Sequence, residues 1–415
     1  MSEVREQAVR AREAARKLAS TSTRTRNTAL TAMADALVER TPEIMAANSA
    51  DMDAAREGGT PGPLLDRLML DEGRIAGIAD ALRELARQPD PLGEVTMGRT
   101  LPNGISLTEV RVPLGVVAMI YEARPNVTAD AAGLAIKTGN AVILRGGTLA
   151  AHSNIVMTEV LSDACVSAGL PADSGQQSAD TSREAASELM SLHGLIDVLI
   201  PRGGAGLIKS VVQNAKVPTI ETGVGNCHVY VHEAADLEMA LPIIINAKCQ
   251  RPGVCNAIES LVIDEGIASR AVPLIVRALR SQGVAVVGDE PTRMLAGGVE
   301  PATEEDWGTE YLDMRISCKV VRGLDDAIAH INRYGTSHSE AFVTDDYEAA
   351  RRFLAEVDAA AVYVNASTRF TDGGEFGLGA EIGISTQKLH ARGPMGLTAL
   401  TTTKFMAMGD GQIRE

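Results

Sequence analysis

The chain has 415 residues, of which 45% are hydrophobic and 22% charged, a composition typical of globular proteins with two or three domains. Its formal net charge of −15 disfavours binding to nucleic acid or to anionic membranes. No run of 18 or more apolar residues is present, which argues against a transmembrane helix, and the charged N-terminal stretch does not resemble a targeting sequence. The five cysteines are odd in number and lack a C-x-x-C motif, so we expect a reducing, cytoplasmic location.

The first part of the chain is predicted to be mostly helical, up to a β signal near residue 105. Ala, Arg and Glu recur at helical spacing in the first 56 residues, and clusters of Gly and Pro mark turns. The pattern predicts, in order, two or three helices within 3–56, a loop at 58–63, a helix at about 71–87, and strands at 105–112 and 116–121.

From residue 116 onward, short apolar segments alternate with amphipathic ones, which is typical of an α/β fold with a parallel, doubly wound sheet. The first series predicts strands at 116–121, 141–145, 196–201 and 219–221 and helices at 129–137, 149–168, 182–192 and 205–214. A second series, sufficient for a second α/β domain, predicts strands at 228–232, 258–263, 285–287, 317–321 and 341–343 and helices at 237–248, 267–282, 324–333 and 347–356. The Thr-rich stretch at 397–407 reads as a late strand, and such strands often pair with another subunit.

Several common cofactor and metal motifs are absent from the sequence. It contains no G-x-G-x-x-G, no P-loop, no H-E-x-x-H and no EF-hand loop. The seven histidines are scattered, and none pairs with another at metal-ligand spacing. We therefore expect no catalytic metal.

The segment from Gln250 to Ala257 is the best candidate for a nucleophile. A helix is predicted to end near Pro252 and a strand to begin just after Cys255, so the thiol lies on a turn that is held from both sides. Arg251 and the amides of the turn can lower the pKa of such a thiol. The alternative is that this cysteine is a small apolar residue in a turn. The other four cysteines are expected in the core or at sheet edges: Cys165, Cys227, Cys249 and Cys318.

A second candidate segment follows the strand at 116–121, at the carboxyl end where open α/β sheets bind ligands. Asn126 could offer an amide N–H to a developing oxyanion, and Arg124 could hold an anion. The alternative is that Asn126 merely caps the following helix.

Two further predicted strands end in the same triplet. Arg145, Gly146 and Gly147 follow one strand, and Arg202-Gly203-Gly204 follows another. Paired glycines allow the backbone to approach a phosphate, and arginine offers a planar fork for it. Either triplet alone could be an ordinary turn, but together they favour a dinucleotide site.

Longer motifs connect the chain to a known family. Pro113–Val117, Asn126, Glu221–Gly223 and a cysteine 34 residues after Glu221 occur in the order typical of the aldehyde dehydrogenase superfamily. From about residue 5 to 410 the chain resembles the γ-glutamyl phosphate reductase family within it. The most specific motifs are Gln250–Asn256, Tyr363–Phe370, Gly377–Glu381 and Ser385–Gly396.

The resemblance implies an aldehyde-dehydrogenase-like fold in three parts. They are an NADPH-binding domain (1–100, 117–224 and about 367–388), a catalytic domain (225–366), and a small oligomerisation flap (101–116 and 389–415).

The resemblance also implies roles for individual residues. Cys255 falls on the family nucleophile, and Asn126 falls on the oxyanion-hole asparagine. Arg145 falls where many relatives place a lysine against the adenosine ribose, and Glu310 falls where a glutamate holds the nicotinamide ribose. Glu221 falls on the base that activates water in hydrolytic relatives, a step that a reductive reaction does not contain.

The implied reaction is the reduction of L-glutamate 5-phosphate by NADPH to L-glutamate 5-semialdehyde and phosphate, through a thioester on Cys255. This is the second step of proline biosynthesis, and its product cyclises to 1-pyrroline-5-carboxylate. The substrate carries a phosphate and an α-carboxylate, for which Arg124, Arg251 and Arg369 are candidate partners. We expect a homo-oligomer and a possible transient association with glutamate 5-kinase.

Two other functions stay open on the sequence alone. One is an oxidising aldehyde dehydrogenase of the same fold that uses Glu221 as its base, which an assay with and without phosphate distinguishes. The other is a non-catalytic sensor of an amino acid or nucleotide. The joint presence of Cys255, Asn126 and Glu310 argues against a sensor.

Overall fold

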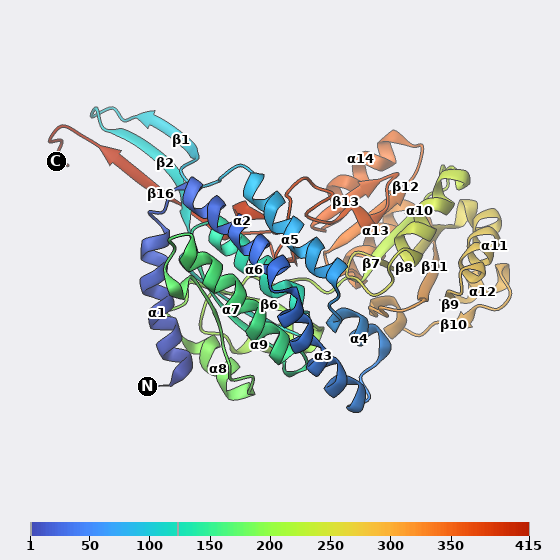
Figure 1. The fold of residues 1–415 in the computed structure, drawn as a ribbon. Helices are drawn as coiled ribbons and strands as arrows, with labels where there is room; N and C mark the ends of the chain where they lie inside the picture. Colours follow the sequence, from blue (N-terminus) through green and yellow to red (C-terminus); the bar gives the residue numbers. More distant parts are fainter. Residues whose placement is uncertain (1, 123, 415) are drawn as a thin grey trace. The chain divides into compact units, whose positions relative to one another are not determined.

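The computed structural model describes residues 2–122 and 124–414, without the side chain of Pro63 (Figure 1). The chain forms two compact units. Unit 1 contains residues 1–222, 377–383 and 395–415, and unit 2 contains residues 223–376 and 384–394. The expected division into three parts stays a prediction. Within the described residues, no helix combines the length and apolar character needed to cross a bilayer.

Unit 1 begins with helices whose starts follow from capping residues. The side chains of Ser2, Ser22 and Asp71 each accept the backbone N–H of the third residue after them, which satisfies an amide that the helix leaves unpaired. The first five helices are α1 (Glu3–Leu18), α2 (Thr23–Glu39), α3 (Thr41–Glu57), α4 (Gly62–Leu68) and α5 (Glu72–Arg87). The prediction of a loop over 58–63 was wrong at its end, where α4 begins beside two prolines.

A four-stranded parallel sheet forms the centre of unit 1, in the order β5-β4-β3-β6. Every residue of β3 is buried, as expected for a central parallel strand covered on both faces. The strands are β3 (Val116–Tyr121), β4 (Ala141–Gly146), β5 (Gly175–Gln177) and β6 (Val198–Arg202); the helices between and after them are α6 (Pro125–Lys137), α7 (Ala151–Ser167), α8 (Arg183–Ser191) and α9 (Ala205–Asn214).

Two predictions in this region were wrong in extent. α6 begins at Pro125 instead of residue 129, because proline suits the first helical position, where no amide is needed. The expected strand at 219–221 is reduced to one bridge, between Thr219 and Leu199 of β6.

A separate antiparallel sheet joins segments far apart in the sequence. β2 (Ser106–Pro113) pairs on one side with β1 (Val95–Thr100) and on the other with β16 (Thr401–Met408). The late strand predicted at 397–407 therefore starts at residue 401 and pairs within its own chain (Figure 1).

Unit 2 contains a parallel sheet of seven strands in the order β10-β9-β11-β8-β7-β12-β13. The strands are β7 (Cys227–Val231), β8 (Ile258–Asp264), β9 (Ala285–Gly288), β10 (Glu300–Pro301), β11 (Arg315–Val321), β12 (Ser339–Val343) and β13 (Ala361–Val364); a short pair, β14 (Ile384–Ser385) and β15 (Gly393–Pro394), lies outside this sheet. The helices are α10 (Leu237–Cys249), α11 (Glu265–Ser281), α12 (Glu290–Leu295), α13 (Gly323–Tyr334) and α14 (Tyr347–Glu356).

Alternate residues of β7 show how both faces of this sheet are covered. Val229 and Val231 pack in a cluster with residues of α10 and α11, whereas Tyr230 packs in a second cluster with residues of α13 and α14. Tyr230 and Phe342 stack with ring centroids 5.0 Å apart. Because successive side chains of a strand point to opposite faces, the two clusters are the two sides of one sheet. The two parallel sheets confirm the predicted α/β fold class.

Candidate active site

The turn that carries Cys255 connects α10 to β8 and is anchored beside the cysteine. The side chain of Asn256 donates to the carbonyl of Thr371 at 2.9 Å, and the hydroxyl of Thr368 donates to the carbonyl of Asn256 at 2.6 Å. Asn256 is buried, while Cys255 is partly exposed. The sequence prediction of a thiol on a turn held by regular structure is thus confirmed in its geometry.

Gly225 lies directly against this turn. A Cβ atom on Gly225 would overlap the carbonyl of Cys255, so only glycine fits here. The amide of Gly225 donates to Glu310 at 2.7 Å, and the thiol of Cys227 lies 3.1 Å from the carbonyl oxygen of Cys255. The structure therefore brings Cys255 and Glu310 together through one glycine, which the sequence analysis did not single out.

All five cysteines are free thiols, and they differ in how deeply they are buried. Cys165, Cys227 and Cys318 are buried, as is typical of core residues. Burial raises the pKa of the Cys165 and Cys318 thiols to about 12 and that of the Cys227 thiol well above its usual value, while the pKa of Cys249 is also raised by burial. A raised pKa leaves little thiolate at neutral pH, so these four thiols are poor nucleophiles. Cys255 is left as the best-placed candidate.

Two arginines accompany the Cys255 turn. Arg369 donates through Nε to the side chain of Gln250 at 2.9 Å. Its pKa is lowered, chiefly by burial and next by the positive charge of Arg251. A phosphate or carboxylate bound near these two arginines would offset this repulsion.

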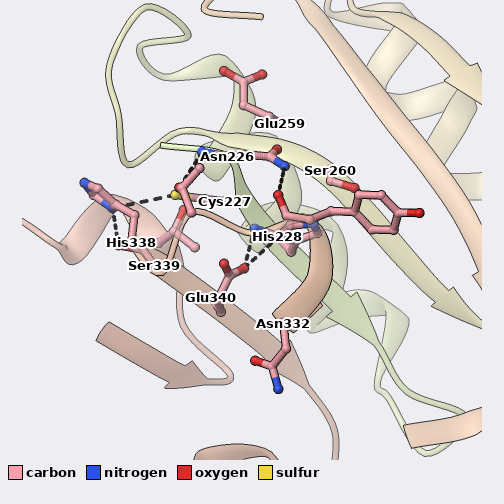
Figure 2. A network of polar contacts seen from close by, with 12 residues as sticks. Asn226, Cys227, His228, Glu259, Ser260, Asn332, His338, Ser339 and Glu340 are labelled. Atoms are coloured by element: carbon pink, nitrogen blue, oxygen red, sulfur yellow. Dashed lines mark hydrogen bonds and ion pairs between the residues drawn. The ribbon is translucent and has the colours of Figure 1, made fainter. Parts of the chain in front are cut away.

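A polar network lies behind the turn, on the starts of neighbouring strands (Figure 2). The side chain of Asn226 donates to the carbonyls of Trp307 and Tyr334, both at 2.8 Å. The thiol of Cys227 lies 3.7 Å from Nδ1 of His338. These contacts link β7 to the segments that precede β11 and β12, and they hold the start of β7 in place beside the cysteine.

A buried ion pair supports the loop that contains Glu310. Lys248 at the end of α10 and Glu259 on β8 are both inaccessible to solvent, and their charged atoms are 2.5 Å apart. Burial opposes both charges, since it raises the pKa of Glu259 to about 7 and lowers the pKa of Lys248. The second oxygen of Glu259 accepts the amide of Leu312 at 3.0 Å, only two residues after Glu310. The pair therefore fixes this loop to the sheet.

In unit 1, Asn126 lies in the first turn of α6, just after β3. Arg124 occupies the N-cap position, so Asn126 is not the helix cap, and its exposed side chain donates instead to Asp130 at 3.1 Å. Burial raises the pKa of Asp130 to about 6, a shift that Asn126 and the nearby charge of Arg202 oppose. Asp130 thus orients one N–H of the Asn126 amide and leaves the other for a ligand.

The order of strands in unit 1 points to a cofactor crevice. All four strands run parallel, but the order in which the chain adds them reverses at β3, because β4 and β5 lie on one side of β3 and β6 lies on the other. Such switch points are where open α/β sheets bind nucleotides. The segment after β6 contains the predicted glycines: a Cβ on Gly203 would meet the carboxylate of Glu122 at 2.7 Å, and the amide of Gly204 donates to the same carboxylate at 2.9 Å. Gly206 faces open space instead. Glu122 and Gly206 were not among the predicted residues.

The other predicted cofactor triplet, Arg145-Gly146-Gly147, makes most of its contacts with neighbouring residues of the protein. The guanidinium of Arg145 donates to the carbonyls of Thr181 and Ser182, the latter at 2.9 Å, while its buried Nε has no acceptor within the described residues. A Cβ on Gly146 would overlap the side chain of Asn154, so packing alone requires this glycine. Gly147 precedes the short helical turn that leads into α7.

Glu221, the last of the predicted site residues, lies in unit 1. Glu221 is half-buried near the end of the first segment of unit 1, where the amide of Ile220 donates to Leu199 of β6 at 3.0 Å. Across residues 2–122 and 124–414 no group of three His, Cys, Asp or Glu residues could hold a metal ion.

We expect Gly225→Ala to reduce turnover strongly, because the added Cβ must displace the Cys255 turn. Gly297→Ala is a matched control in the same unit, since a Cβ there would meet nothing within 4 Å. Steady-state kinetics and thermal unfolding of both variants check this. Turnover of Gly225→Ala equal to that of the control would mean that the position of the turn does not matter.

Known proteins share this architecture. The family model described as "Aldehyde dehydrogenase family" matches residues 1–296. A "Gamma-glutamyl phosphate reductase" of Moorella thermoacetica is 59% identical over 413 residues, covering 100% of this chain and 99% of the relative, and one of Thermobifida fusca is 56% identical over 412 residues, covering 99% of each chain.

Solved structures of related proteins resemble this chain as well. A crystal structure of gamma-glutamyl phosphate reductase from Thermotoga maritima matches with a TM-score of 0.97 and 48% identity, over 100% of both chains. An acetylating aldehyde dehydrogenase from Geobacillus thermoglucosidasius, at 19% identity and a TM-score of 0.71 over 100% of this chain and 98% of its own, shares the fold. The chain therefore belongs to the aldehyde dehydrogenase family of enzymes, in its γ-glutamyl phosphate reductase group.

Proposed function

We propose that this protein reduces γ-glutamyl phosphate to glutamate 5-semialdehyde with NADPH, through a thioester on Cys255. The observation that carries the proposal is the Cys255 turn. Its thiol is partly exposed, its backbone is held by Asn256 and abuts Gly225, and Arg251 and Arg369 lie beside it. The relatives at 56–59% identity with the same named activity support the choice of substrate.

In the proposed reaction, Cys255 forms the covalent intermediate and Asn126 stabilises the oxyanion. The Cys255 thiolate attacks the acyl carbon of the substrate, the C–O bond to phosphate breaks, and inorganic phosphate leaves with the bonding electrons. NADPH, when bound, supplies the hydride that reduces the thioester carbonyl. Asn126 donates an N–H to the oxyanion of the resulting thiohemiacetal. Collapse of that oxyanion releases the aldehyde and restores the Cys255 thiolate. No water is activated, so Glu221 has no base role in this direction.

The substrate brings two anionic groups, and three arginines are proposed to meet them. Arg251 and Arg369 form the pair beside Cys255, which suits the phosphate that must leave from the neighbouring carbon. Arg124, at the N-cap position of α6, is proposed for the α-carboxylate.

The residues of unit 1 suit a dinucleotide, and Glu310 is proposed, from the family resemblance, for the nicotinamide ribose. The switch point between β3 and β6, the glycines of Arg202-Gly203-Gly204 and the open side of Gly206 suit the close approach of a pyrophosphate to α9. Glu122 already accepts the amide of Gly204, so the phosphate must use the later amides of that turn. Arg145 is proposed for the 2′-phosphate because its buried Nε lacks an acceptor within the described residues, and Gly146 and Gly147 continue that segment.

The test is oxidation of glutamate 5-semialdehyde in the reverse direction, with NADP or NAD, in the presence and absence of phosphate. We expect turnover to require phosphate and to prefer NADP. Turnover that is equal without phosphate would indicate an oxidising aldehyde dehydrogenase and would overturn the proposal. Equal rates with the two cofactors would remove the proposed preference for NADPH and the assignment of Arg145 to the 2′-phosphate, but not the phosphate-dependent reaction.

The sheet formed by β1, β2 and β16 is proposed to be an interface with further copies of the chain. Phe405 and Met408 of β16 are 62% and 73% exposed, which is unusual for two large apolar side chains on one strand. Glutamate 5-kinase, which supplies the acyl phosphate, is proposed as a transient partner.

A further inference from the structure

Asp130 is the only acidic residue of α6, and the helix itself gives no reason for it. It lies beyond the first turn, where the helix dipole favours a negative charge. Aspartate is also a poor helix former in a helix interior, because its side chain competes with the backbone for hydrogen bonds. An acid at this position therefore points to a role other than helix stability.

The contact that Asp130 makes is with the proposed oxyanion donor. Its Oδ2 accepts a hydrogen bond from Nδ2 of Asn126 at 3.1 Å, across four positions of α6 and so on the same face of the helix. Within residues 2–122 and 124–414, neither side chain makes another hydrogen bond. Asn126 is exposed, whereas Asp130 is partly buried. The more fixed acid therefore orients the more mobile amide.

The charge of Asp130 decides which side of the amide it can hold. An asparagine amide has a donor side and an acceptor side of nearly the same shape. An ionised carboxylate only accepts hydrogen bonds, so it attracts the NH₂ group and repels Oδ1. One hydrogen of that NH₂ group then binds Asp130, and the other is available to an oxyanion. A protonated acid can also donate, so it would hold either side of the amide.

The surroundings of Asp130 place this change of charge in an accessible pH range. Burial raises the pKa of Asp130 to about 6, while the hydrogen bond from Asn126 and the positive charge of Arg202, at the end of β6, oppose the rise. Titratable side chains on the other elements packed against α6 have partners of their own: Arg26 of α2 pairs with Asp90, Arg83 of α5 with Asp35 and Asp80, Arg145 of β4 with two carbonyls, His152 of α7 with Asp51, and Tyr121 of β3 with Thr128.

We propose that Asp130 is a positioning residue for the oxyanion step: its ionised carboxylate keeps the donor side of the Asn126 amide available to the substrate, and protonation releases the amide. This inference rests on the proposed function, in which Asn126 stabilises the oxyanion. Asp130 acts through Asn126 and needs no contact of its own with the substrate.

The kinetic test compares the wild type with Asp130→Asn, which keeps the shape of the side chain but, like a protonated acid, can both donate and accept. Phosphate-dependent oxidation of glutamate 5-semialdehyde by NADP is measured between about pH 5 and pH 8. At the upper end we expect the wild-type kcat to exceed that of the variant by about tenfold, part of the roughly hundredfold cost of losing an oxyanion donor altogether. KM should not change.

The pH dependence has a definite sign. Asp130 is ionised above a pH of about 6 and protonated below it, so the ratio of the two kcat values should fall toward one at the acid end of the range. The ionisation of Cys255 affects both enzymes and cancels in this ratio. Asp80→Asn is the matched control, because Asp80 is an exposed acid of α5 whose partner Arg83 lies three residues later. Its ratio to the wild type should be one at every pH, and both variants should keep the wild-type Tm.

A second measurement does not depend on turnover. In protein labelled with a heavy nitrogen isotope at asparagine side chains, the NMR signals of the Asn126 amide are identified by their loss in Asn126→Ala. We expect them to shift with a midpoint near the pKa of Asp130, and to stay constant in Asp130→Asn. Constant signals in the wild type, or a kcat ratio that stays near one at every pH, would overturn the proposal. A wild type without phosphate-dependent turnover would instead refute the proposed function, and the NMR titration would still show whether Asp130 holds Asn126.

Discussion

Replacement of Cys255 by alanine is expected to lower phosphate-dependent turnover by about a thousandfold or more, the scale seen when a nucleophile is removed. No other thiol can take over, because Cys227 is buried and burial raises the pKa of both Cys227 and Cys249. Alanine fits the turn without new atoms, so the Tm and the affinity for NADPH should remain near the wild-type values.

Cys249→Ala is the matched control for this experiment. It removes a half-buried thiol at the end of α10, six residues before Cys255, and should leave turnover largely unchanged. Steady-state kinetics, cofactor titration and thermal unfolding are measured for both variants. If Cys255→Ala kept even a tenth of wild-type turnover, the nucleophile would have to be another group.

Replacement of Asn126 by alanine is expected to lower kcat by about a hundredfold or more, which is the typical cost of losing one oxyanion donor. KM should change little, because the contact forms fully only in the transition state. Asn126 is exposed in the first turn of α6 and is not its N-cap, so its loss should cost little stability.

Asn214→Ala serves as the control for Asn126, since Asn214 is an exposed asparagine at the end of α9 with a local contact to Ser210. Kinetics of both variants are compared over a range of substrate concentrations. A large rise in KM with a normal kcat for Asn126→Ala would instead assign Asn126 to substrate binding.

Local patterns were sufficient to predict most of the parallel architecture. The continuous apolar run of β3 has no polar alternation, so its position inside a covered sheet follows from the sequence. β8 is also fully buried, but it contains Glu259 and Ser260, and the charge of Glu259 is buried there beside Lys248. The helices α9 and α14 were predicted with the observed bounds, because glycine or aspartate caps precede them and amphipathic residues fill them.

The sequence analysis did not predict the elements that lack an apolar or amphipathic pattern. β1 is almost wholly exposed along its length, so it carries no apolar signal and is held as a strand by β2. The short strands β5, β10 and β13 give too few residues to establish a period. Long-range pairing, rather than local preference, determines these segments.

The candidate site shows the same division between local and long-range information. Cys255 and Asn126 stand out because each follows or precedes a regular element within a recognisable motif. Gly225 does not stand out in the sequence, because its importance depends on the carbonyl of Cys255, which only the fold brings near. Lys248 and Glu259 do not stand out either, because each matters only as the buried partner of the other.

The central claim is that Cys255 carries the acyl group, and mass spectrometry tests it most directly. The protein is incubated with glutamate 5-semialdehyde and NADP without phosphate, so that oxidation of the thiohemiacetal forms the thioester but no phosphate is present to cleave it. We predict a γ-glutamyl adduct on the peptide that contains Cys255, and its loss when phosphate is added. An adduct on another residue, or rapid phosphate-dependent turnover by an enzyme whose Cys255 peptide never gains the adduct, would contradict the account.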